Sequence, residues 1–311
     1  MAKKIESNYT DLSIRSLDWK EHIRLRPGMY IGKLGNGTSP DDGIYILFKE
    51  IIDNSIDEFM MGNGKSIDIV IKDNAVSITD YGRGIPLEKV VDCVSKINTG
   101  GKYDDQAFQK SIGLNGVGAK AVNALSNQFI VQSVRQGQVK IVEFSRGELI
   151  KENSIEKTNI KDGTKIFFKP DDSIFKGFIF NLEYIQEQIF AYVCLNTGLS
   201  INLNGQKYVS KYGLLDYIQN KTNNLKLKYQ IIHFKNKDIE IALTHSFQYG
   251  EQYYSFVNGQ LTQSGGTHLL AFKEAIVKTL REYYNKNYDV ADIRASIIAA
   301  ISIRIQDPIF E

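Results

Sequence analysis

The chain has 311 residues, of which 42% are hydrophobic and 24% are charged, and these values are typical of a globular protein with a substantial core. The length favours two domains, and a formal net charge of +2 is too small to indicate a nucleic-acid-binding protein without a local basic cluster. The two cysteines, Cys93 and Cys194, are too few for a disulfide framework, and their apolar surroundings indicate buried thiols. There is no apolar signal region at the start, and the apolar run at 295–303 is too short to cross a bilayer, so we expect a cytoplasmic protein with no membrane partner.

The segment 41–61, which follows a polar arm at residues 1–20, is the most strongly patterned stretch of the chain. Its apolar residues recur at helical spacing and predict one amphipathic helix. Four polar side chains fall on a single arc of about 100°: Glu50, Asn54, Asp57 and Glu58. A solvated face is the usual meaning of such a stripe, but this one contains no lysine or arginine for pairing along the helix.

Strands and helices alternate through the rest of the chain. Residues 66–71 and 75–79 alternate in polarity around an Asp73-Asn74 turn and predict a β-hairpin. Further strands are predicted at 129–133, 139–144, 165–169, 239–244 and 253–258, and helices at 87–97, 119–125, 182–194, 213–219 and 269–285. The Asn- and Lys-rich segment 220–238 is interpreted as a solvated linker with a hairpin, although a basic patch is the alternative. Thr267 is expected to cap the helix at 269–285, which gives the neighbouring His268 a structural role.

Two glycine-rich segments carry possible binding chemistry. Gly113, Gly116 and Gly118 follow neither the dinucleotide-binding order nor the P-loop order, yet a glycine turn that opens a helix offers amides and a positive dipole end to an anion. Asp80, at a strand end, can accept a hydrogen bond from an exocyclic amine, and the glycines that follow it let a flat ring approach the backbone. Each segment alone is more often an ordinary turn.

Glu50 and Asn54 lie one helical turn apart on the polar arc. Glutamate can take a proton from water, and an amide oxygen can bind a hard cation such as Mg²⁺, which uses few protein ligands. The acidic helix, the strand end at Asp80 and the glycine loop occur close together in the sequence, and together they supply the parts of an ATP site.

The order of these motifs, completed by Gly163-Thr164, resembles the ATPase superfamily of gyrase, large heat-shock chaperones, histidine kinases and MutL. Within it, the segments 26–32, 53–58 and 82–86 resemble the B-type subunit of bacterial type II topoisomerases. The segments 257–259, 265–268 and 291–294 are similar to the transducer region of that family, so the resemblance covers almost the whole chain.

This resemblance implies an α/β fold in two parts. Residues 21–222 would form an ATP-binding domain of the Bergerat type, a two-layer sandwich of a mixed β-sheet and helices. Residues 223–311 would form a partial second α/β domain, a transducer of ribosomal S5-like fold, and residues 1–20 a dimerisation arm.

The resemblance also implies roles for individual residues. Glu50 would be the general base, Asn54 the Mg²⁺ ligand, and Asp80 the acceptor for the adenine amine of ATP. The other expected ATP-binding residues are Tyr9 (reaching the partner's nucleotide), Glu58, Arg83, Gly84, Ile85, Pro86, Lys102, Gly113, Leu114, Asn115, Gly116, Val117, Gly118 and Thr164. Arg135 would lie at an outer rim, which aminocoumarin inhibitors engage in the family.

The family further implies a homodimer that forms on ATP binding, double-stranded DNA as substrate and an A-type topoisomerase subunit as partner. Three departures stand out: Ile46 and Asn115 replace histidines, and Phe108 replaces a nucleotide-contacting tyrosine. The sequence ends where the family's Gln-Thr-Lys switch loop would follow, so we expect ATP binding with weak hydrolysis. The segments 54–57 and 113–116 favour topoisomerase IV over gyrase.

Two alternatives remain open. The same fold could serve a histidine kinase, although none of the four histidines lies in an obvious phosphoacceptor helix. A non-hydrolysing, ATP-gated dimerisation module would use the same binding residues without turnover.

Overall fold

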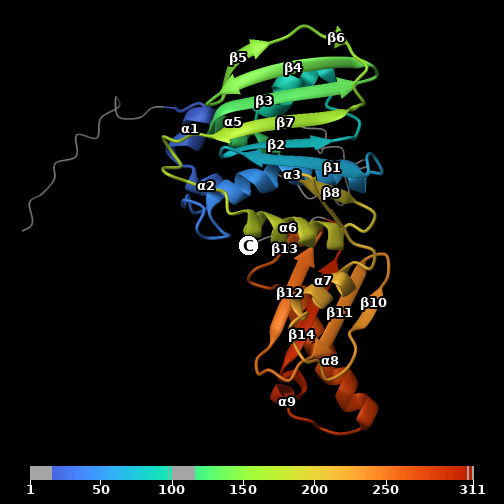
Figure 1. Cartoon of the computed structure of the whole chain (residues 1–311). Coiled ribbons are helices and arrows are strands. Elements are labelled where there is room, and N and C mark those ends of the chain that lie inside the picture. The colour runs from blue at the N-terminus through green and yellow to red at the C-terminus, as the bar shows by residue number, and fades with distance from the viewer. Residues whose placement is uncertain (1–15, 98, 100–115, 307, 310–311) are drawn as a thin grey trace, which may run out of the picture.

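A computed structural model describes residues 16–97, 99, 116–306 and 308–309 of the chain. The elements of the described residues are arranged around two β-sheets, which lie one above the other in Figure 1. Several predicted positions lie outside the described residues: Tyr9, Lys102, Phe108, Gly113, Leu114 and Asn115.

The first sheet is mixed, with the strand order β5-β4-β3-β7-β2-β1-β8-β9 and with β6 paired to β4. Its strands are β1 (Ser66–Lys72), β2 (Ala75–Asp80), β3 (Ser126–Arg135), β4 (Gln138–Ser145), β5 (Glu148–Glu152), β6 (Glu156–Lys157), β7 (Gly163–Pro170), β8 (Ser200–Leu203) and β9 (Gln206–Val209). All neighbouring pairs are antiparallel except β1 and β8, which are parallel. The predicted hairpin between β1 and β2 is confirmed: Asp73 and Asn74 both have positive φ, as a tight two-residue turn requires.

Helices cover one face of this sheet (Figure 1). They are α1 (Trp19–Leu25), α2 (Gly28–Ile31), α3 (Gly43–Met60), the 3₁₀ helix η2 (Leu87–Lys89), α4 (Val90–Ser95), α5 (Gly118–Ala124) and α6 (Leu182–Leu195). Buried and partly exposed residues alternate along β2 and β4, so only one side of each strand faces the helices. The predicted two-layer sandwich is therefore confirmed.

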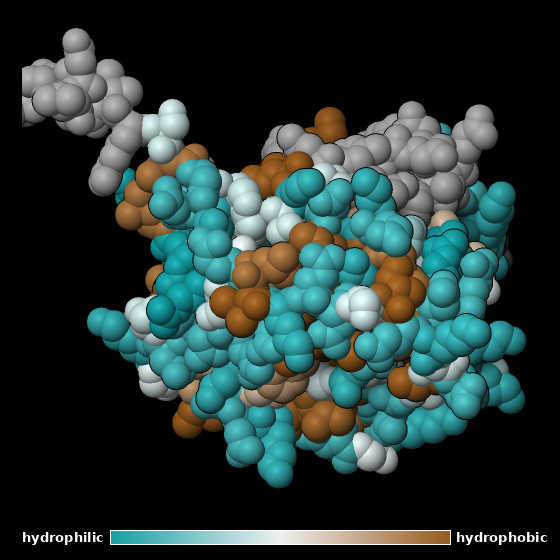
Figure 2. All heavy atoms as spheres, turned by 90° about the horizontal axis from the view of Figure 1, so that it is seen from above, coloured by the Kyte–Doolittle hydropathy of each residue, from teal (hydrophilic) through white to brown (hydrophobic). Residues whose placement is uncertain are grey.

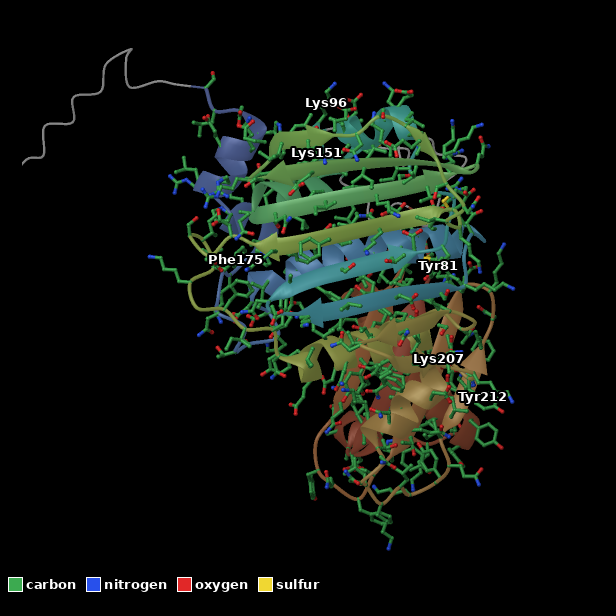
Figure 3. The ribbon with its side chains drawn as sticks, turned by 45° about the horizontal axis from the view of Figure 1, so that its top comes forward. Tyr81, Lys96, Lys151, Phe175, Lys207 and Tyr212 are labelled. Carbon is green, nitrogen blue, oxygen red and sulfur yellow. The ribbon has the colours of Figure 1, made fainter. Side chains whose placement is uncertain are left out.

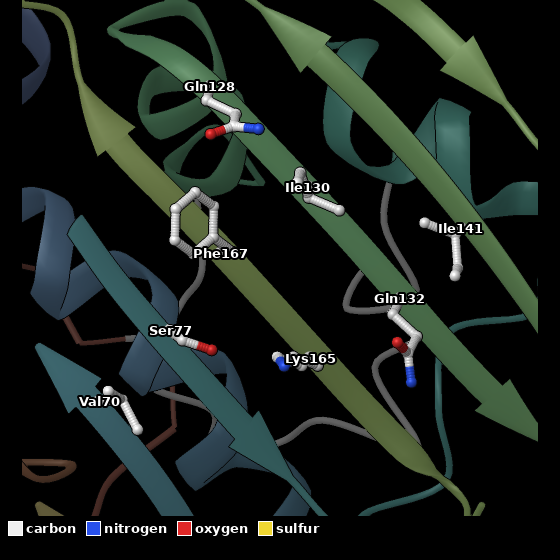
Figure 4. Close-up of a pocket in the computed structure, with 8 residues that line it drawn as sticks. All are labelled: Val70, Ser77, Gln128, Ile130, Gln132, Ile141, Lys165 and Phe167. Atoms are coloured by element: carbon white, nitrogen blue, oxygen red, sulfur yellow. The ribbon is translucent and has the colours of Figure 1, made fainter. Parts of the chain in front are cut away.

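The other face of the sheet carries no helix among the described residues and is hollowed in its middle. Figure 4 shows this hollow on the open face. It is lined by Val70, Ser77, Gln128, Ile130, Gln132, Ile141, Lys165 and Phe167. None of these is a predicted site residue.

The second sheet has the order β10-β11-β14-β12-β13. Its elements are α7 (Leu214–Lys221), β10 (Ile232–Lys235), β11 (Ile239–His245), β12 (Gln252–Val257), β13 (Gln260–Leu261), α8 (Thr267–Tyr284), α9 (Val290–Arg294) and β14 (Ile297–Ile303). The central strand β14 is covered on both sides. Ile298 and Ala300 belong to the hydrophobic cluster that includes α7, whereas Ile297 and Ala299 belong to the cluster that includes Phe272 of α8.

The structure bears on two expectations from the sequence, the cap of α8 and the position of the domain boundary. Thr267 does not cap α8: the helix begins at Thr267 itself, after a Gly266 whose φ of 137° suits only glycine, and no side-chain cap bond is made. The domain boundary at 222/223 remains a prediction, but the packing of Leu214 and Ile218 against the second sheet favours a boundary before α7.

Among the described residues, no helix is long and apolar enough to span a bilayer. Seen from above (Figure 2), the surface is covered mostly by hydrophilic residues with hydrophobic side chains scattered between them.

Candidate functional site

Helix α3, which packs on the first sheet, carries the predicted base Glu50 and the predicted metal ligand Asn54. Ile44, Phe48 and Ile52 of its apolar stripe are fully buried. This burial fixes the direction of the opposite arc, where Glu50, Asn54 and Glu58 are partly exposed. Asp57, the fourth residue of the predicted arc, is instead buried. The sequence predicts a helix at 41–61 and the structure has one at Gly43–Met60, so the prediction is confirmed.

Asp80 ends β2 as an almost fully buried carboxylate, 7% exposed. Its Oδ1 accepts hydrogen bonds from the amides of Gly82 (2.9 Å) and Thr164 (3.2 Å). Ser55, one turn after Ile51 on α3, donates its hydroxyl to Oδ2 at 3.4 Å. Burial raises the pKa of Asp80 to about 6 although these three donors act in the opposite direction. Tyr81, labelled in Figure 3, follows Asp80 at this end of the sheet.

Three glycines allow the backbone to pack closely around Asp80. Gly84 has a φ of 71°, and a Cβ there would collide with the carbonyl oxygen of Val134. A Cβ on Gly163 would collide with the carbonyl oxygen of Asp80, and one on Gly82 with the Glu58 side chain. Glycine is therefore required at these three positions for the backbone to pack this closely around Asp80.

An ion pair lies beside Asp80 and Gly82. The Nη2 and Nε atoms of Arg83 donate to Glu58 at 2.9 and 3.1 Å, and the Arg83 amide donates to the same carboxylate. Burial acts to raise the pKa of Glu58, but Arg83, together with the charge of Arg135, holds it below its ordinary value. Arg135 donates to the carbonyl oxygen of Gly84 at 3.2 Å, which brings the predicted rim residue to the same edge.

Glu50 meets the start of α5. A Cβ added to Gly118 would collide with the Glu50 carboxylate, so that carboxylate packs directly against the first residue of the helix. One turn along α3, Asn54 donates its Nδ2 to the carbonyl oxygen of Glu50 at 2.8 Å, so its amide oxygen is the atom turned away from that carbonyl. Gly118, the first residue of α5, thus lies beside the polar arc of α3.

Sequence reasoning misses several residues that support this site. Ser55 falls on the apolar stripe, where a lone hydroxyl indicates a buried polar partner but does not identify that partner as Asp80. The Ser133 hydroxyl donates to the carbonyl oxygen of Ile85 at 2.7 Å. Lys120 is 3% exposed, and its Nζ donates to the carbonyl oxygens of Thr99 and Gly116. The contacts of Ser133 with Ile85 and of Lys120 with Thr99 join separate segments of the chain, so no local pattern indicates them.

A second missed group lies beneath the polar arc. Asp53, 2% exposed, accepts from Lys49 Nζ on one oxygen and from the Tyr192 hydroxyl of α6 on the other, each at 2.6 Å. Burial alone would lower the pKa of Lys49, but the charges of Asp53 and Glu50 hold it above its ordinary value. Burial, reinforced by Asp53, raises the pKa of Tyr192 well above its ordinary range, so this hydroxyl remains a donor.

Across the described residues, no group of three or more His, Cys, Asp or Glu side chains is placed to hold a metal ion. Mg²⁺ typically takes few protein ligands and completes its shell with phosphate oxygens and water. The amide oxygen of Asn54 and the Glu50 carboxylate are hard donors of the right type, so the residues present fit such an ion.

Two family models match the chain in succession. Residues 40–174 match the model of histidine kinase-, DNA gyrase B- and HSP90-like ATPases, and residues 213–311 match the DNA gyrase B model. The first match contains every predicted site residue that the structure describes, and the second begins at the residue before α7, in agreement with the packing of that helix.

Individual relatives agree with these matches. The chain is 50% identical over 304 residues to the B-type subunit of DNA topoisomerase 4 from Borreliella burgdorferi, covering 98% of this chain and 51% of that protein. It is 33% identical to the same subunit of Staphylococcus aureus, again covering 98% of this chain and 50% of the relative. The chain therefore spans about half the length of the curated relatives it matches.

Solved structures share the architecture. The 43K ATPase domain of Thermus thermophilus gyrase B, solved in complex with an aminocoumarin, superposes with a TM-score of 0.72 at 28% identity, covering 94% of this chain and 82% of that one. The ATPase region of Saccharomyces cerevisiae topoisomerase II superposes with a TM-score of 0.82 at 22% identity, covering 96% and 88%, which shows a shared fold. Taken with the two model matches and the sequence relatives, these likenesses show that the chain belongs to the family of B-type subunits of type II topoisomerases and contains the ATPase region of that family.

Proposed function

We propose that this chain binds ATP beside α3, the end of β2, the start of β7 and the start of α5, and that Glu50 promotes hydrolysis there. The observation that carries the proposal is the packing of the Glu50 carboxylate against Gly118. A candidate general base thereby meets a glycine-rich helix start, where a γ-phosphate and its attacking water would have to lie.

Adenine recognition is assigned to Asp80. Its Oδ1 is already committed to two backbone amides, so Oδ2, held only by the long bond from Ser55, is the better acceptor for an exocyclic amine. The amide of Thr164 and the bare backbone at Gly84 support the ring, with Ile85 and Pro86 following along the same segment. Glu58, Arg83 and Arg135 form the rim.

The phosphates are assigned to the loop that ends at Gly116, Val117 and Gly118. The earlier part of this loop (Lys102, Gly113, Leu114 and Asn115) lies outside the described residues and remains a prediction, as does a contact from Tyr9. Asn54 would hold Mg²⁺ through its amide oxygen. When bound, the ion would neutralise phosphate charge and orient the γ-phosphate.

Glu50 acts on water in this scheme. A carboxylate within hydrogen-bond reach of the attacking water accepts its proton as the bond to phosphorus forms, and phosphoryl transfer otherwise depends on positioning and charge neutralisation. The hydrogen bond from Asn54 to the Glu50 carbonyl ties the metal ligand to the same turn of helix as the base.

The activity of the whole protein is likewise a proposal, because the chain spans about half of its relatives. We propose that it is a type II DNA topoisomerase acting on double-stranded DNA with an A-type subunit, in which ATP binding drives homodimerisation. The 50% identity to a B-type subunit of DNA topoisomerase 4 favours topoisomerase IV over gyrase. Aminocoumarins, one of which is present in the solved complex of a gyrase B relative, are proposed to bind at the Arg135 rim.

Replacement of Glu50 by alanine tests hydrolysis separately from binding. The variant should bind a non-hydrolysable ATP analogue with wild-type affinity but lose turnover by at least about 100-fold, in the range expected for general-base catalysis. Wild-type turnover in Glu50→Ala would contradict the assignment. The alternative, a non-hydrolysing ATP-gated dimerisation module, predicts analogue-driven dimers with no measurable turnover even in the wild-type protein.

A further inference from the structure

The buried group formed by Lys49, Asp53 and Tyr192 is not used by the chemistry described above. Both carboxylate oxygens of Asp53 are occupied, Oδ2 by Lys49 Nζ and Oδ1 by the Tyr192 hydroxyl, each at 2.6 Å. A buried carboxylate with a charged and a neutral donor in good geometry is rigid, since loss of either bond leaves a polar atom uncompensated.

This group lies at the turn of α3 that carries the catalytic elements. Lys49 precedes Glu50 in the chain and Asp53 precedes Asn54, whereas Tyr192 belongs to α6, separated from Asp53 by 139 positions. The hydrogen bond from Tyr192 is therefore a polar connection between the two helices at the level of the base. It opposes both rotation of α3 about its axis and sliding along α6.

A small rotation of α3 has a large effect on the base. With a helix radius of about 5–6 Å including side chains, a rotation of about 10° moves a side-chain tip by about 1 Å. A displacement of that size can lower a reaction rate by about 100-fold.

We infer that Tyr192, acting through Asp53 and Lys49, is a positioning residue that holds Glu50 in the orientation needed for hydrolysis. The inference rests on the proposed function, because it requires Glu50 to be the base. Docking of α6 does not depend on the hydroxyl, since Ile185, Ile189 and Val193 of the same helix are fully buried in the main core. Removal of the hydroxyl therefore breaks the link to α3 while the apolar docking of α6 remains in place.

The test is Tyr192→Phe in the full-length protein, with Tyr184→Phe as the matched control. Tyr184 lies on the same helix and donates its hydroxyl to the carbonyl oxygen of Thr38 at 3.1 Å, away from the base. Single-turnover and steady-state hydrolysis give kcat and KM, and calorimetry gives the affinity for a non-hydrolysable ATP analogue. We expect kcat to fall about 10-fold in Tyr192→Phe, with KM and analogue affinity within about 2-fold of wild type, and no change in the control.

A second experiment, in which Tyr192→Phe is added to the Glu50→Gln variant, separates positioning from a general loss of structure. Residues that act as a unit are non-additive, so in Glu50→Gln the further change Tyr192→Phe should alter the residual rate by less than about 2-fold. If Tyr192→Phe does not fold, Lys49→Met removes the other donor of Asp53 and should lower kcat in the same way.

Three outcomes would overturn the inference. In the first, Tyr192→Phe keeps the wild-type kcat while Glu50→Gln is slow, so the inference fails and the proposed function stands. In the second, kcat falls equally in the wild-type and Glu50→Gln backgrounds or in the Tyr184→Phe control, which indicates a structural role. In the third, Glu50→Gln retains the wild-type rate, and both the inference and the assignment of the base fail.

Discussion

Asp80→Asn should make the protein more stable and, at the same time, a poorer binder of ATP. The asparagine amide has nearly the shape of the carboxylate: its oxygen can accept from Gly82 and Thr164, and its nitrogen can donate to the Ser55 hydroxyl. The substitution therefore removes the charge but keeps the three hydrogen-bonded contacts, with the direction of the Ser55 bond reversed, so it isolates the cost of burying that charge.

The magnitude follows from the raised pKa. Burial raises the pKa of Asp80 to about 6 from an ordinary value of 3.8, so between these pH values the folded protein holds more protons than the unfolded chain. Stability must then fall as the pH rises from about 4 to about 6, and the difference between the two pKa values corresponds to about 3 kcal/mol. Asparagine does not ionise, so the Asp80→Asn variant avoids this fall in the free energy of unfolding. It should be more stable than wild type at pH 8 by about 1–3 kcal/mol.

Urea denaturation at pH 4, 6 and 8 measures this effect, with Asp172→Asn as a control at an exposed carboxylate. Calorimetry with a non-hydrolysable ATP analogue measures the other half of the prediction. Loss of a charge-assisted hydrogen bond costs about 1.5–3 kcal/mol, which corresponds to affinity about 10–100-fold weaker. The reasoning is refuted if the variant is no more stable than wild type at pH 8, or if it binds the analogue with unchanged affinity.

Three further predictions concern the other parts of the site. Gly118→Ala should displace the Glu50 carboxylate and lower kcat by about 100-fold with a much smaller change in analogue affinity, and equal losses of the two would contradict this. Asn54→Ala should remove the dependence of analogue binding on Mg²⁺ in calorimetric titrations, and a variant whose binding still responds to Mg²⁺ would exclude Asn54 as the ligand. Glu58→Gln should change the free energy of unfolding by less than about 1 kcal/mol, because the ion pair with Arg83 is partly exposed, and an effect above about 2 kcal/mol in urea denaturation would show that the pair is more than a rim contact.

Local pattern is sufficient where one face of an element is buried. The sequence predicts helix α3 and the hairpin of β1 and β2 within two residues of their observed ends, since an apolar stripe or an alternating strand shows its own period. From the sequence alone, the apolar run at 295–303 is considered only as a membrane-spanning segment, and it is too short to be one. It contains β14, and because that strand is covered on both faces its residues do not alternate and no strand period is visible.

Contacts between distant segments cannot be predicted in this way. The polar arc of α3 identifies Glu50, Asn54 and Glu58, but nothing local shows that Asp53 on the same helix is buried against Tyr192. Likewise Ser55 has no polar neighbour in sequence that would pair it with Asp80; the two meet because β2 lies beneath α3. The roles of the site residues, the A-type subunit and DNA as partners, and the cytoplasmic location stay predictions.

The most direct test of the ATP site is a comparison of two nucleotides in calorimetric titrations of the wild-type protein with Mg²⁺. Asp80 would present a carboxylate oxygen to position 6 of the purine, where adenine carries an amine and guanine a carbonyl oxygen. The account predicts that a non-hydrolysable ATP analogue binds at least about 100-fold more tightly than the corresponding GTP analogue, because an acceptor facing an acceptor leaves both unpaired. Equal affinities would contradict the assignment of Asp80, and with it the proposed orientation of the nucleotide.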